Sequence, residues 1–230
     1  AMGSRALVVE LGAGAATKIR LLLDQLDDPV GYIPIDISAD QLLAAARDFA
    51  EIYPDIPIIP VSADYTRPLE LPDPPRPANR TVAFFPGSTI GNFERDEAVE
   101  FLRRINDIVG NRGGLLIGVD LHKNRAVLER AYNDSQGLTA RFNLNILDVV
   151  NRELDADFDH RLFSHDAIYD VVERRIEMRL VSHREQEIAV NDETVRLRAG
   201  EFIITEYSHK YDLDTFASMA VEARFEVRDV

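Results

Sequence analysis

The sequence predicts an α/β fold in which a parallel sheet is interrupted late in the chain by an inserted α+β segment. Between residues 6 and 120, short apolar runs alternate with helical repeats five times, as in a parallel sheet with helices on both faces. Each run is followed by glycine or an acidic residue, and such residues at strand ends commonly bind ligands. After residue 125 the pattern changes to helices and then to ribbon-like strands.

The elements of the predicted sheet follow in chain order. The run 6–11 is short and unalternating, as in a strand that is buried on both faces. Ser38 opens a capping-box pattern before the second helix, and four prolines in residues 70–79 predict a surface loop. We expect strands over 6–11, 32–35, 58–61, 81–85 and 115–119, and helical stripes over 19–26, 42–53 and 94–109.

The insert spans about 80 residues of mixed character. A helical pattern over 125–153 is broken near Gly137, and Asn191-Asp192 predicts a hairpin turn. A helix over 214–220 and a strand from Phe225 are then expected to resume the strand–helix alternation of the parallel sheet. We expect ribbon strands over 168–172, 176–181, 187–190, 194–197 and 202–207.

Composition excludes several classes of protein. The formal net charge of −14 argues against sequence-independent nucleic-acid binding, which depends on Lys and Arg contacts to phosphate. Without cysteine there is no disulfide framework, thiolate metal site or catalytic thiol. No apolar run approaches the roughly 20 residues of a membrane span, and no leader opens the chain, so we expect a cytoplasmic location. Lysine is scarce: only Lys18, Lys123 and Lys210 occur.

The strand ends carry a pattern that favours a nucleoside cofactor. Glu10-x-Gly12-x-Gly14 is a tight turn, but the dinucleotide fingerprint would place a third glycine where this chain has Thr17. Asp36 follows Gly14 by 22 residues, where a carboxylate accepts hydrogen bonds from ribose hydroxyls in both NAD and S-adenosylmethionine (SAM) proteins. An acidic-aromatic pair at the third strand end and Gly113-Gly114 before the fifth strand favour SAM. Strand-end aspartates also cap helices, which is the alternative explanation.

Longer stretches carry a family resemblance. The sequence Phe84-Phe85-Pro86-Gly87-Ser88-Thr89-Ile90-Gly91-Asn92-Phe93 is the most specific. Together with residues 9–18, 32–38, 116–120, 131–134 and 205–208 it resembles the histidine-specific, SAM-dependent methyltransferases that make hercynine in ergothioneine biosynthesis. The resemblance spans nearly all of residues 6–225. It implies a class I, Rossmann-like SAM domain over 1–122 and 209–230, with an inserted substrate domain over 123–208.

The resemblance also implies site residues. The cofactor would be SAM, leaving as S-adenosylhomocysteine, without a metal, and Lys18 would reach its methionine carboxylate. Asn92, as the catalytic residue, would hold the substrate amine, Tyr132 would donate to the substrate carboxylate, and Met178 would pack on the ring. Glu206 and Ser208, which have strand spacing, would bind the two imidazole nitrogens. The implied SAM residues are Gly12, Lys18, Asp36, Asp64, Tyr65, Gly87 and Ser88.

The resulting hypothesis is trimethylation of the α-amino group of L-histidine by a monomer that binds neither nucleic acid nor membrane. The attacking amine must be neutral, and holding it near the methyl group supplies most of the catalysis. The five histidines lie outside the matched site positions, so we interpret them as surface or structural residues.

Three alternatives stay open at this point. The chain could be a methyltransferase for another amino acid or small amine, a truncated non-catalytic SAM-binding module, or an NAD-dependent oxidoreductase, which Thr17 disfavours. Relatives have a segment before the first strand, and residues 1–4 resemble a vector remnant. We therefore expect the chain to lack that segment and the extreme C-terminus, and to bind SAM with weak or absent turnover.

Overall fold

The computed structural model describes residues 2–14 and 18–230. These residues form two compact units. The first comprises residues up to 89, 94–119 and 213–230, and the second comprises 90–93 and 120–212. Assigning the units to cofactor and substrate stays a prediction.

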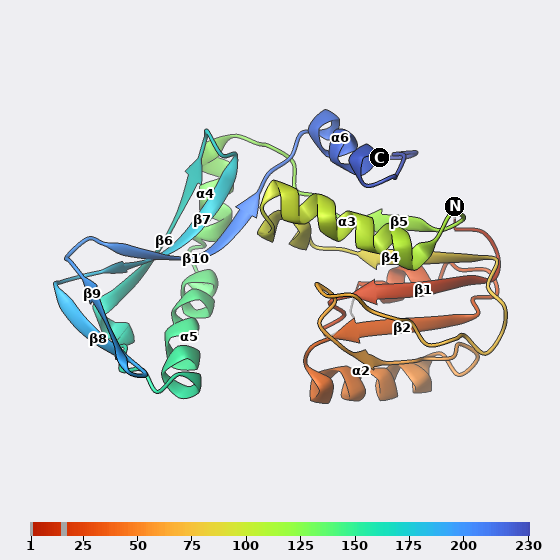
Figure 1. The fold of residues 1–230 in the computed structure, drawn as a ribbon, viewed down its shortest axis with the longest axis horizontal. Coiled ribbons are helices and arrows are strands. Elements are labelled where there is room, and N and C mark those ends of the chain that lie inside the picture. Colours follow the sequence, from red (N-terminus) through yellow and green to blue (C-terminus); the bar gives the residue numbers. More distant parts are fainter. Residues whose placement is uncertain (1, 15–17) are drawn as a thin grey trace. The chain divides into compact units, whose positions relative to one another are not determined.

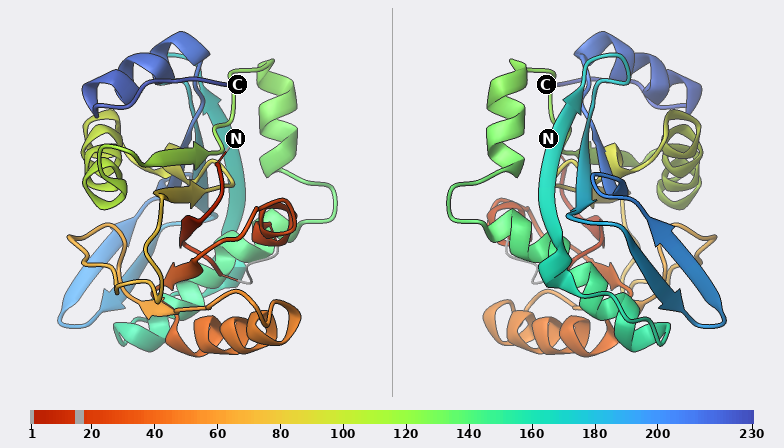
Figure 2. Two further views of the ribbon diagram at one scale, coloured as in Figure 1. Left: turned by 90° about the vertical axis from the view of Figure 1, so that its right-hand side faces the viewer. Right: turned by 90° about the vertical axis from the view of Figure 1, so that its left-hand side faces the viewer.

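The first unit contains a five-stranded parallel sheet of order β3-β2-β1-β4-β5 (Figure 1). Helices α1 and α2 lie on one face, and α3 and α6 lie on the other (Figure 2). The central strand β1 is buried along its whole length, which explains its unbroken apolar sequence. The strands are β1 (Ala6–Leu11), β2 (Gly31–Asp36), β3 (Val61–Ser62), β4 (Arg80–Phe85) and β5 (Gly114–Ile117); the helices are α1 (Ile19–Leu23), α2 (Ala39–Ile52), α3 (Arg95–Val109) and α6 (Leu213–Glu222), with a 3-10 turn η1 (Thr89–Asn92) after β4.

The second unit packs two helices on an antiparallel sheet of order β10-β7-β6, with a separate hairpin of β8 and β9. Gly137, at φ +64°, separates the helices, and Asn191, at φ +51°, lies in the hairpin turn, so both predicted breaks are confirmed. The elements are α4 (Arg125–Tyr132), α5 (Leu138–Glu153), η2 (His160–Leu162), β6 (Phe163–Asp170), β7 (Arg175–Ser182), β8 (Gln186–Val190), β9 (Glu193–Leu197) and β10 (Phe202–His209).

Four predicted local features are wrong. The third strand is shorter than 58–61, because Pro57 and Pro60 have no N–H to donate to the ladder, and only a bridge at Ile58 precedes β3. The first helix ends at Leu23 instead of residue 26. The capping box at Ser38 does not form: its side chain makes no cap, and its backbone N–H, which the Gln41 side chain would accept, donates to the Asp36 carboxylate instead (2.9 Å). Residues 225–230 form no strand.

Candidate functional site

The glycine turn after β1 joins the ends of two neighbouring strands, β1 and β2. Gly12 has φ +71°, and its N–H donates to the carbonyl of Ile35 in β2 at 2.9 Å. The backbone N–H of Gly14 donates to the Asp36 carboxylate at 2.8 Å. Residues 15–17 lie outside the described residues, and they include Thr17, which stands where the dinucleotide fingerprint has its third glycine. The predicted residues Gly12 and Asp36 therefore meet at the carboxyl edge of the sheet, where ligands of such sheets bind.

The Tyr65 ring lies against the glycine turn. A side chain at Gly12 would place its Cβ 3.3 Å from Tyr65 Cε1, so only glycine leaves this face of the ring open. The ring packs on Phe85 and Phe101, and burial together with the charges of Asp36 and Asp64 raises the pKa of Tyr65. An aromatic face bordered by carboxylates suits an aminated heterocycle on a ribose.

Asp64 is already engaged at the end of β3. Its Oδ1 accepts hydrogen bonds from the hydroxyl of Thr66 (2.6 Å) and from the Thr66 N–H (2.9 Å), and these bonds lower its pKa. Its Oδ2 pairs with Arg67 at 3.2 Å. Its role at a cofactor stays a prediction, because these contacts also fit a turn-capping residue.

Lys18 and the loop after β4 lie at the same carboxyl edge of the parallel sheet. The Nζ of Lys18 lies 3.2 Å from the position that a Cβ of Gly87 would occupy. Gly87 (φ +83°) and Ser88 (φ +62°) both have left-handed backbone conformations, and Gly118 packs 3.0 Å from the Gly87 nitrogen by the same measure. The loop thus presents backbone beside an exposed ammonium group, which fits a ligand carboxylate.

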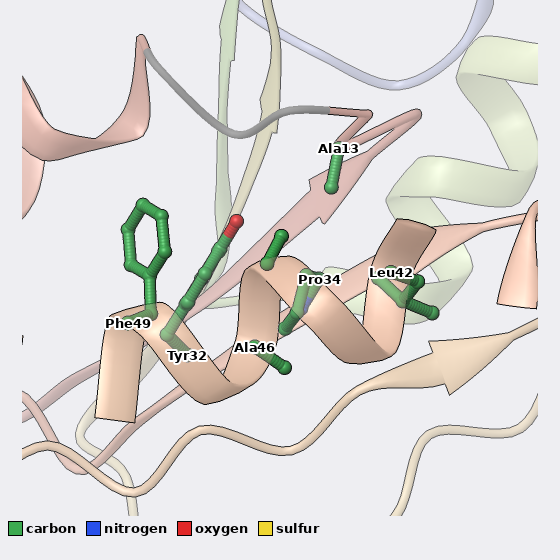
Figure 3. A pocket seen from close by; sticks show the side chains of 7 residues that line it. Ala13, Tyr32, Pro34, Leu42, Ala46 and Phe49 are labelled. Carbon is green, nitrogen blue, oxygen red and sulfur yellow. The ribbon is translucent and has the colours of Figure 1, made fainter. Parts of the chain in front are cut away.

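Glu10 is a buried carboxyl beneath this edge. Only 2 % of it is exposed, and it accepts a hydrogen bond from the hydroxyl of Tyr32. Burial raises its pKa to about 7, although the Tyr32 hydrogen bond and the Lys18 charge act in the opposite direction. Beside it, a gap too narrow to hold a water molecule lies between β2 and α2 (Figure 3). Its lining is apolar apart from Tyr32 and contains none of the predicted cofactor residues, so we interpret it as a packing gap: Ala13, Tyr32, Pro34, Leu42, Ala45, Ala46 and Phe49.

The second unit brings the predicted substrate residues to one face of its three-stranded sheet. Glu206 lies directly opposite Met178 in the antiparallel pairing of β10 and β7. Ser208, two residues further along β10, points to the same side. Met178 is buried with Leu128 of α4, and the Tyr132 ring packs on this cluster. Met178 therefore also fits the plain-core alternative, and its contact with substrate stays a prediction.

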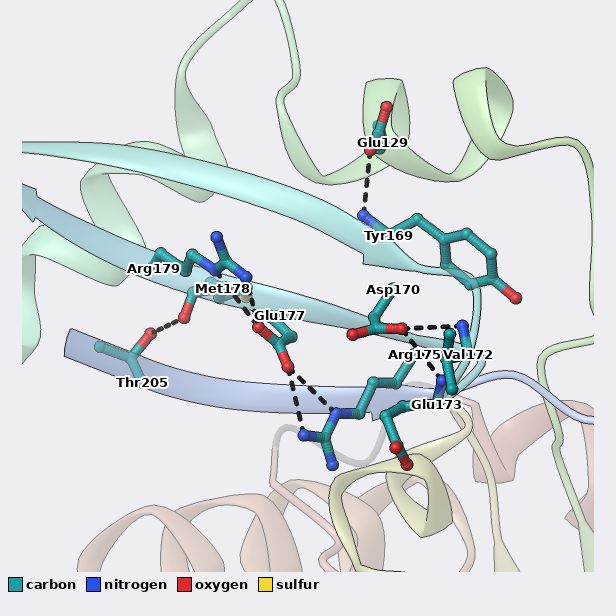
Figure 4. Close-up of polar contacts among 10 residues, drawn as sticks. All are labelled: Glu129, Tyr169, Asp170, Val172, Glu173, Arg175, Glu177, Met178, Arg179 and Thr205. Carbon is teal, nitrogen blue, oxygen red and sulfur yellow. Dashed lines mark hydrogen bonds and ion pairs between the residues drawn. The ribbon is translucent and has the colours of Figure 1, made fainter. Parts of the chain in front are cut away.

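A β-bulge at Thr205 sets the direction of Glu206. The register of β10 shifts between Ile204 and Glu206, so one extra residue lies on this strand. The Thr205 hydroxyl lies within hydrogen-bonding distance of the carbonyl of Met178 (3.1 Å; Figure 4). Its single hydrogen is shared between that carbonyl and Oδ1 of the buried Asn143 (2.6 Å), and these contacts hold the bulge in place. Without the extra residue, Glu206 would point to the opposite face.

That opposite face carries a different set of charges. Glu177, next to Met178 in β7, is held between Arg175 (3.2 Å) and Arg179 (2.6 Å) (Figure 4). The Arg175 guanidinium stacks 3.6 Å over the ring of Tyr207, which neighbours Glu206 on β10. The alternation along both strands separates this ion-pair network from the predicted substrate face.

Tyr132 and Ser208 are hydrogen-bonded to one another at 2.8 Å. Both hydroxyls also accept hydrogen bonds from Lys210, at 3.0 Å and 2.7 Å. Glu206 is half-buried, and burial raises its pKa while the Lys210 charge partly opposes that effect. A carboxylate and a pair of hydroxyls therefore line one surface, as hydrogen-bonding groups for a polar ring.

Asn92 is placed by a close backbone contact. It ends η1, and its neighbour Gly91 packs so tightly on β10 that a Cβ there would lie 2.8 Å from the His209 carbonyl oxygen. Tyr211 donates its hydroxyl to the carbonyl of Ile90 (3.3 Å). The exposed Asn92 side chain is thus held beside the end of the strand that carries Glu206 and Ser208.

His165 confirms the interpretation of one histidine as structural. Its Nδ1 accepts from the Asn143 amide (2.9 Å), so its Nε2–H donates to the backbone carbonyl of Tyr132 (2.9 Å). The Thr205 bulge and the C-terminal end of α4 are therefore connected through Asn143 and His165.

Comparisons with known proteins identify the family. The whole chain, residues 1–230, matches the family model described as "Histidine-specific methyltransferase, SAM-dependent". The chain belongs to the histidine-specific, SAM-dependent methyltransferase family. It is 40 % identical over 221 residues to the histidine N-alpha-methyltransferase of Mycolicibacterium smegmatis, covering 94 % of this chain and 68 % of that protein. It is 40 % identical over 209 residues to the protein of the same name from Mycobacterium tuberculosis, covering 89 % of this chain and 64 % of that protein.

A solved structure with low sequence identity has the same fold as this chain. The CcbJ methyltransferase from Streptomyces caelestis superposes with a TM-score of 0.54 at 14 % identity, covering 99 % of this chain and 76 % of that one. The class I methyltransferase fold predicted from the sequence is therefore confirmed. Within the described residues, none of this methyltransferase's helices is both long and apolar enough to cross a membrane.

Sequence reasoning missed Lys210, Asn143 and Thr205 as site-forming residues of this methyltransferase. Lys210 carried a signal in the scarcity of lysine, and its position two residues beyond Ser208 on the same strand extended the site pattern. Thr205 lay in the matched stretch 205–208, but its bulge becomes visible only once the strands are paired, and Asn143 carried no signal.

Proposed function

We propose that this chain transfers methyl groups from SAM to the α-amino group of L-histidine, three times in succession, giving hercynine of the ergothioneine pathway. Two 40 % identical relatives are named histidine N-alpha-methyltransferases. The observation that carries the proposal is the juxtaposition of the Glu206 carboxylate with the hydroxyls of Tyr132 and Ser208 on one sheet face. A neutral imidazole, with one N–H and one bare nitrogen, complements an acceptor and a donor side by side.

The cofactor would occupy the carboxyl edge of the parallel sheet. Bound there, SAM supplies an electrophilic methyl group on a sulfonium sulfur. Asp36 would accept from its ribose hydroxyls, Tyr65 would stack on its adenine, and Lys18 would pair with its carboxylate. The geometry supports this set, because Gly12 leaves the Tyr65 ring open and the Lys18 ammonium lies beside the Gly87 loop. The proposed SAM residues are Gly12, Lys18, Asp36, Asp64, Tyr65, Gly87 and Ser88.

The substrate residues would bind and orient histidine. Glu206 would accept the imidazole N–H, and the hydrogen-bonded hydroxyls of Ser208 and Tyr132 would donate the one hydrogen that they do not share to the bare ring nitrogen. Asn92 would hold the α-amine, and Met178 would pack on the ring face. An apolar ring would leave the half-buried Glu206 without a partner, and this loss discriminates more strongly than a size mismatch does.

A methyl-transfer assay tests the proposed function. We expect purified chain with SAM to give, at low turnover, products one, two and three methyl groups heavier from histidine, by mass spectrometry, and none from the other nineteen amino acids. Glu206→Ala should weaken histidine binding roughly tenfold to a hundredfold, because it removes a hydrogen bond to a charged group, while SAM binding is retained. The matched control is Glu187→Ala on β8, an exposed carboxylate outside the site. Equal transfer to another amino acid, or unchanged histidine affinity in Glu206→Ala, would refute the substrate assignment.

A further inference from the structure

Lys210 is a buried ammonium group that the proposed reaction does not yet use. Its side chain is 0 % exposed, and it directly follows β10, the strand that carries Glu206 and Ser208. A buried lysine is costly unless its charge is paired and each of its hydrogens is bonded. The Asp120 carboxylate supplies the counter-charge, with Oδ2 3.1 Å from Nζ.

The backbone fixes Asp120 in that place. The Tyr211 N–H donates to the Asp120 carbonyl (2.9 Å), and Leu121 forms a parallel bridge with Tyr211. Asp120 also pairs with the largely exposed Lys123 at 2.6 Å. Burial raises the pKa of Asp120, but the hydrogen bonds from Lys123 and Lys210 outweigh burial and leave that pKa lowered. Asp120 is therefore held as a carboxylate, the natural partner for the Lys210 side chain beside it.

Counting hydrogens shows what Lys210 does to the hydroxyl pair. An ammonium has three N–H donors and no acceptor, and its three partners are Asp120, Ser208 Oγ (2.7 Å) and Tyr132 Oη (3.0 Å). Both hydroxyl oxygens therefore accept from Lys210. The pair has two hydrogens of its own, and only one of them is used in the 2.8 Å bond between the hydroxyls.

One hydroxyl hydrogen therefore remains, and neither hydroxyl donates it to an acceptor among residues 2–14 and 18–230. Of the two hydroxyls, the one that keeps its hydrogen accepts one hydrogen bond from Lys210 and one from the other hydroxyl. Both of its lone pairs are therefore occupied. That hydroxyl can only donate. The same face thus offers a ligand one hydrogen-bond donor beside the acceptor-only carboxylate of Glu206.

We propose that Lys210 is a specificity-determining positioning residue, which holds the Tyr132–Ser208 pair as a hydrogen-bond donor so that the site selects a ring with one N–H and one bare nitrogen. This inference rests on the proposed function, because it concerns how histidine is told apart from other ring-bearing amino acids. Residues two apart on a strand are spaced by roughly 6.5 Å, enough for Glu206 to accept from one edge of a five-membered ring while the hydroxyl pair at Ser208 donates to the opposite edge.

Three ring analogues separate the two hydrogen bonds. Histidine has both an N–H and a bare nitrogen, pyrrolylalanine has the N–H alone, and thiazolylalanine has the bare nitrogen alone. We expect the wild-type chain, titrated by calorimetry in the presence of S-adenosylhomocysteine, to prefer histidine roughly tenfold over each analogue. In Lys210→Met, the ammonium no longer holds the spare hydroxyl hydrogen toward the ligand, and the hydroxyls are free to rotate. The hydrogen bond to the bare nitrogen should therefore weaken and the preference over pyrrolylalanine should fall to within about twofold, while the preference over thiazolylalanine, set by Glu206, is retained.

Lys123→Met is the matched control. It removes a lysine from the same carboxylate but does not touch either hydroxyl, so both preferences should match those of the wild type. A thermal melt and a SAM titration check that each variant is folded. Should Lys210→Met fail to fold, Lys210→Gln keeps amide hydrogens in the same space and should give a smaller loss in the same direction.

The outcomes distinguish this inference from the function on which it rests. A wild-type chain that binds SAM but not histidine refutes the proposed function, and the role of Lys210 falls with it. A folded Lys210 variant that keeps the full preference over pyrrolylalanine overturns the inference alone. A variant that loses both preferences equally also overturns it, because that result shows only a general collapse of the face.

Discussion

Replacing Glu10 by glutamine should change how the stability of the protein depends on pH. Glu10 is 2 % exposed and lies under the glycine turn, where burial raises its pKa to about 7. In the unfolded chain the same carboxyl titrates near 4.5. Between these two values the folded protein holds a proton that the unfolded chain releases, so the free energy of unfolding falls as the pH rises through this window.

The magnitude follows from the difference between the two pKa values. Two and a half units correspond to about 3 kcal/mol, fully lost above pH 7. Part of the loss occurs at pH values near the isoelectric point of about 4.8, where the protein is poorly soluble. About 2 kcal/mol of it falls between pH 5.5 and 8, where measurement is practical.

The assay is urea unfolding of wild type and Glu10→Gln at pH 5.5, 6.5, 7.2 and 8.0. Glutamine retains an acceptor for the Tyr32 hydroxyl but does not ionise, so the difference in unfolding free energy should move in favour of Glu10→Gln by about 2 kcal/mol across the series. Taking differences cancels the titration of all other groups. Glu193→Gln, an exposed carboxyl on β9, should give a flat difference. A flat difference for Glu10→Gln as well would refute the buried, protonated state of Glu10.

Three further substitutions test the framework of each unit. Asp36→Ala should weaken SAM binding by tenfold or more in calorimetry while histidine binding persists, and unchanged SAM affinity would place the cofactor elsewhere. Gly91→Ala puts a Cβ 2.8 Å from the His209 carbonyl and should cost about 1–3 kcal/mol in chemical unfolding, whereas Gly114→Ala meets only a side-chain atom at 4.0 Å and should be tolerated. Thr205→Val removes the hydroxyl that secures the bulge, so histidine affinity should fall while SAM affinity holds; equal histidine affinity would show that the bulge forms without it.

The parallel sheet could be predicted because its signals are local. Each strand end carries its own turn chemistry, so Gly12, Asp36 and Gly87 are visible as single positions in a linear pattern, and the topology places them at one edge. Where local rules compete, the prediction failed. In the capping box predicted at Ser38, the backbone N–H that Gln41 would accept is bound by Asp36, whose carboxylate lies at the end of β2.

The substrate face was predicted only as far as family motifs reach. Strand spacing places Glu206 and Ser208 on one side, but which side depends on the bulge at Thr205, and its partners Met178 and Asn143 are distant in sequence. A one-residue shift reverses a strand face, so register cannot be predicted from alternation alone. The hydrogen bond between Tyr132 and Ser208 is likewise a tertiary contact, and it links two side chains that the sequence assigned to different parts of the substrate.

The choice of lysine at position 210 shows how composition and geometry meet. The chain uses arginine for nearly all of its cations, and the planar guanidinium is the better group for a two-oxygen partner such as Glu177. Lys210 instead serves three oxygens from three separate side chains, and a compact ammonium on a flexible stem can donate in three directions at once. Lys123 contacts the same Asp120 from a side chain that is 51 % exposed, so it needs no such set of acceptors. The scarcity of lysine draws attention to Lys123 and Lys210 equally. What separates them is that Lys210 is completely buried with every ammonium hydrogen bonded, as its proposed role at the substrate face requires, whereas Lys123 only neutralises a carboxylate.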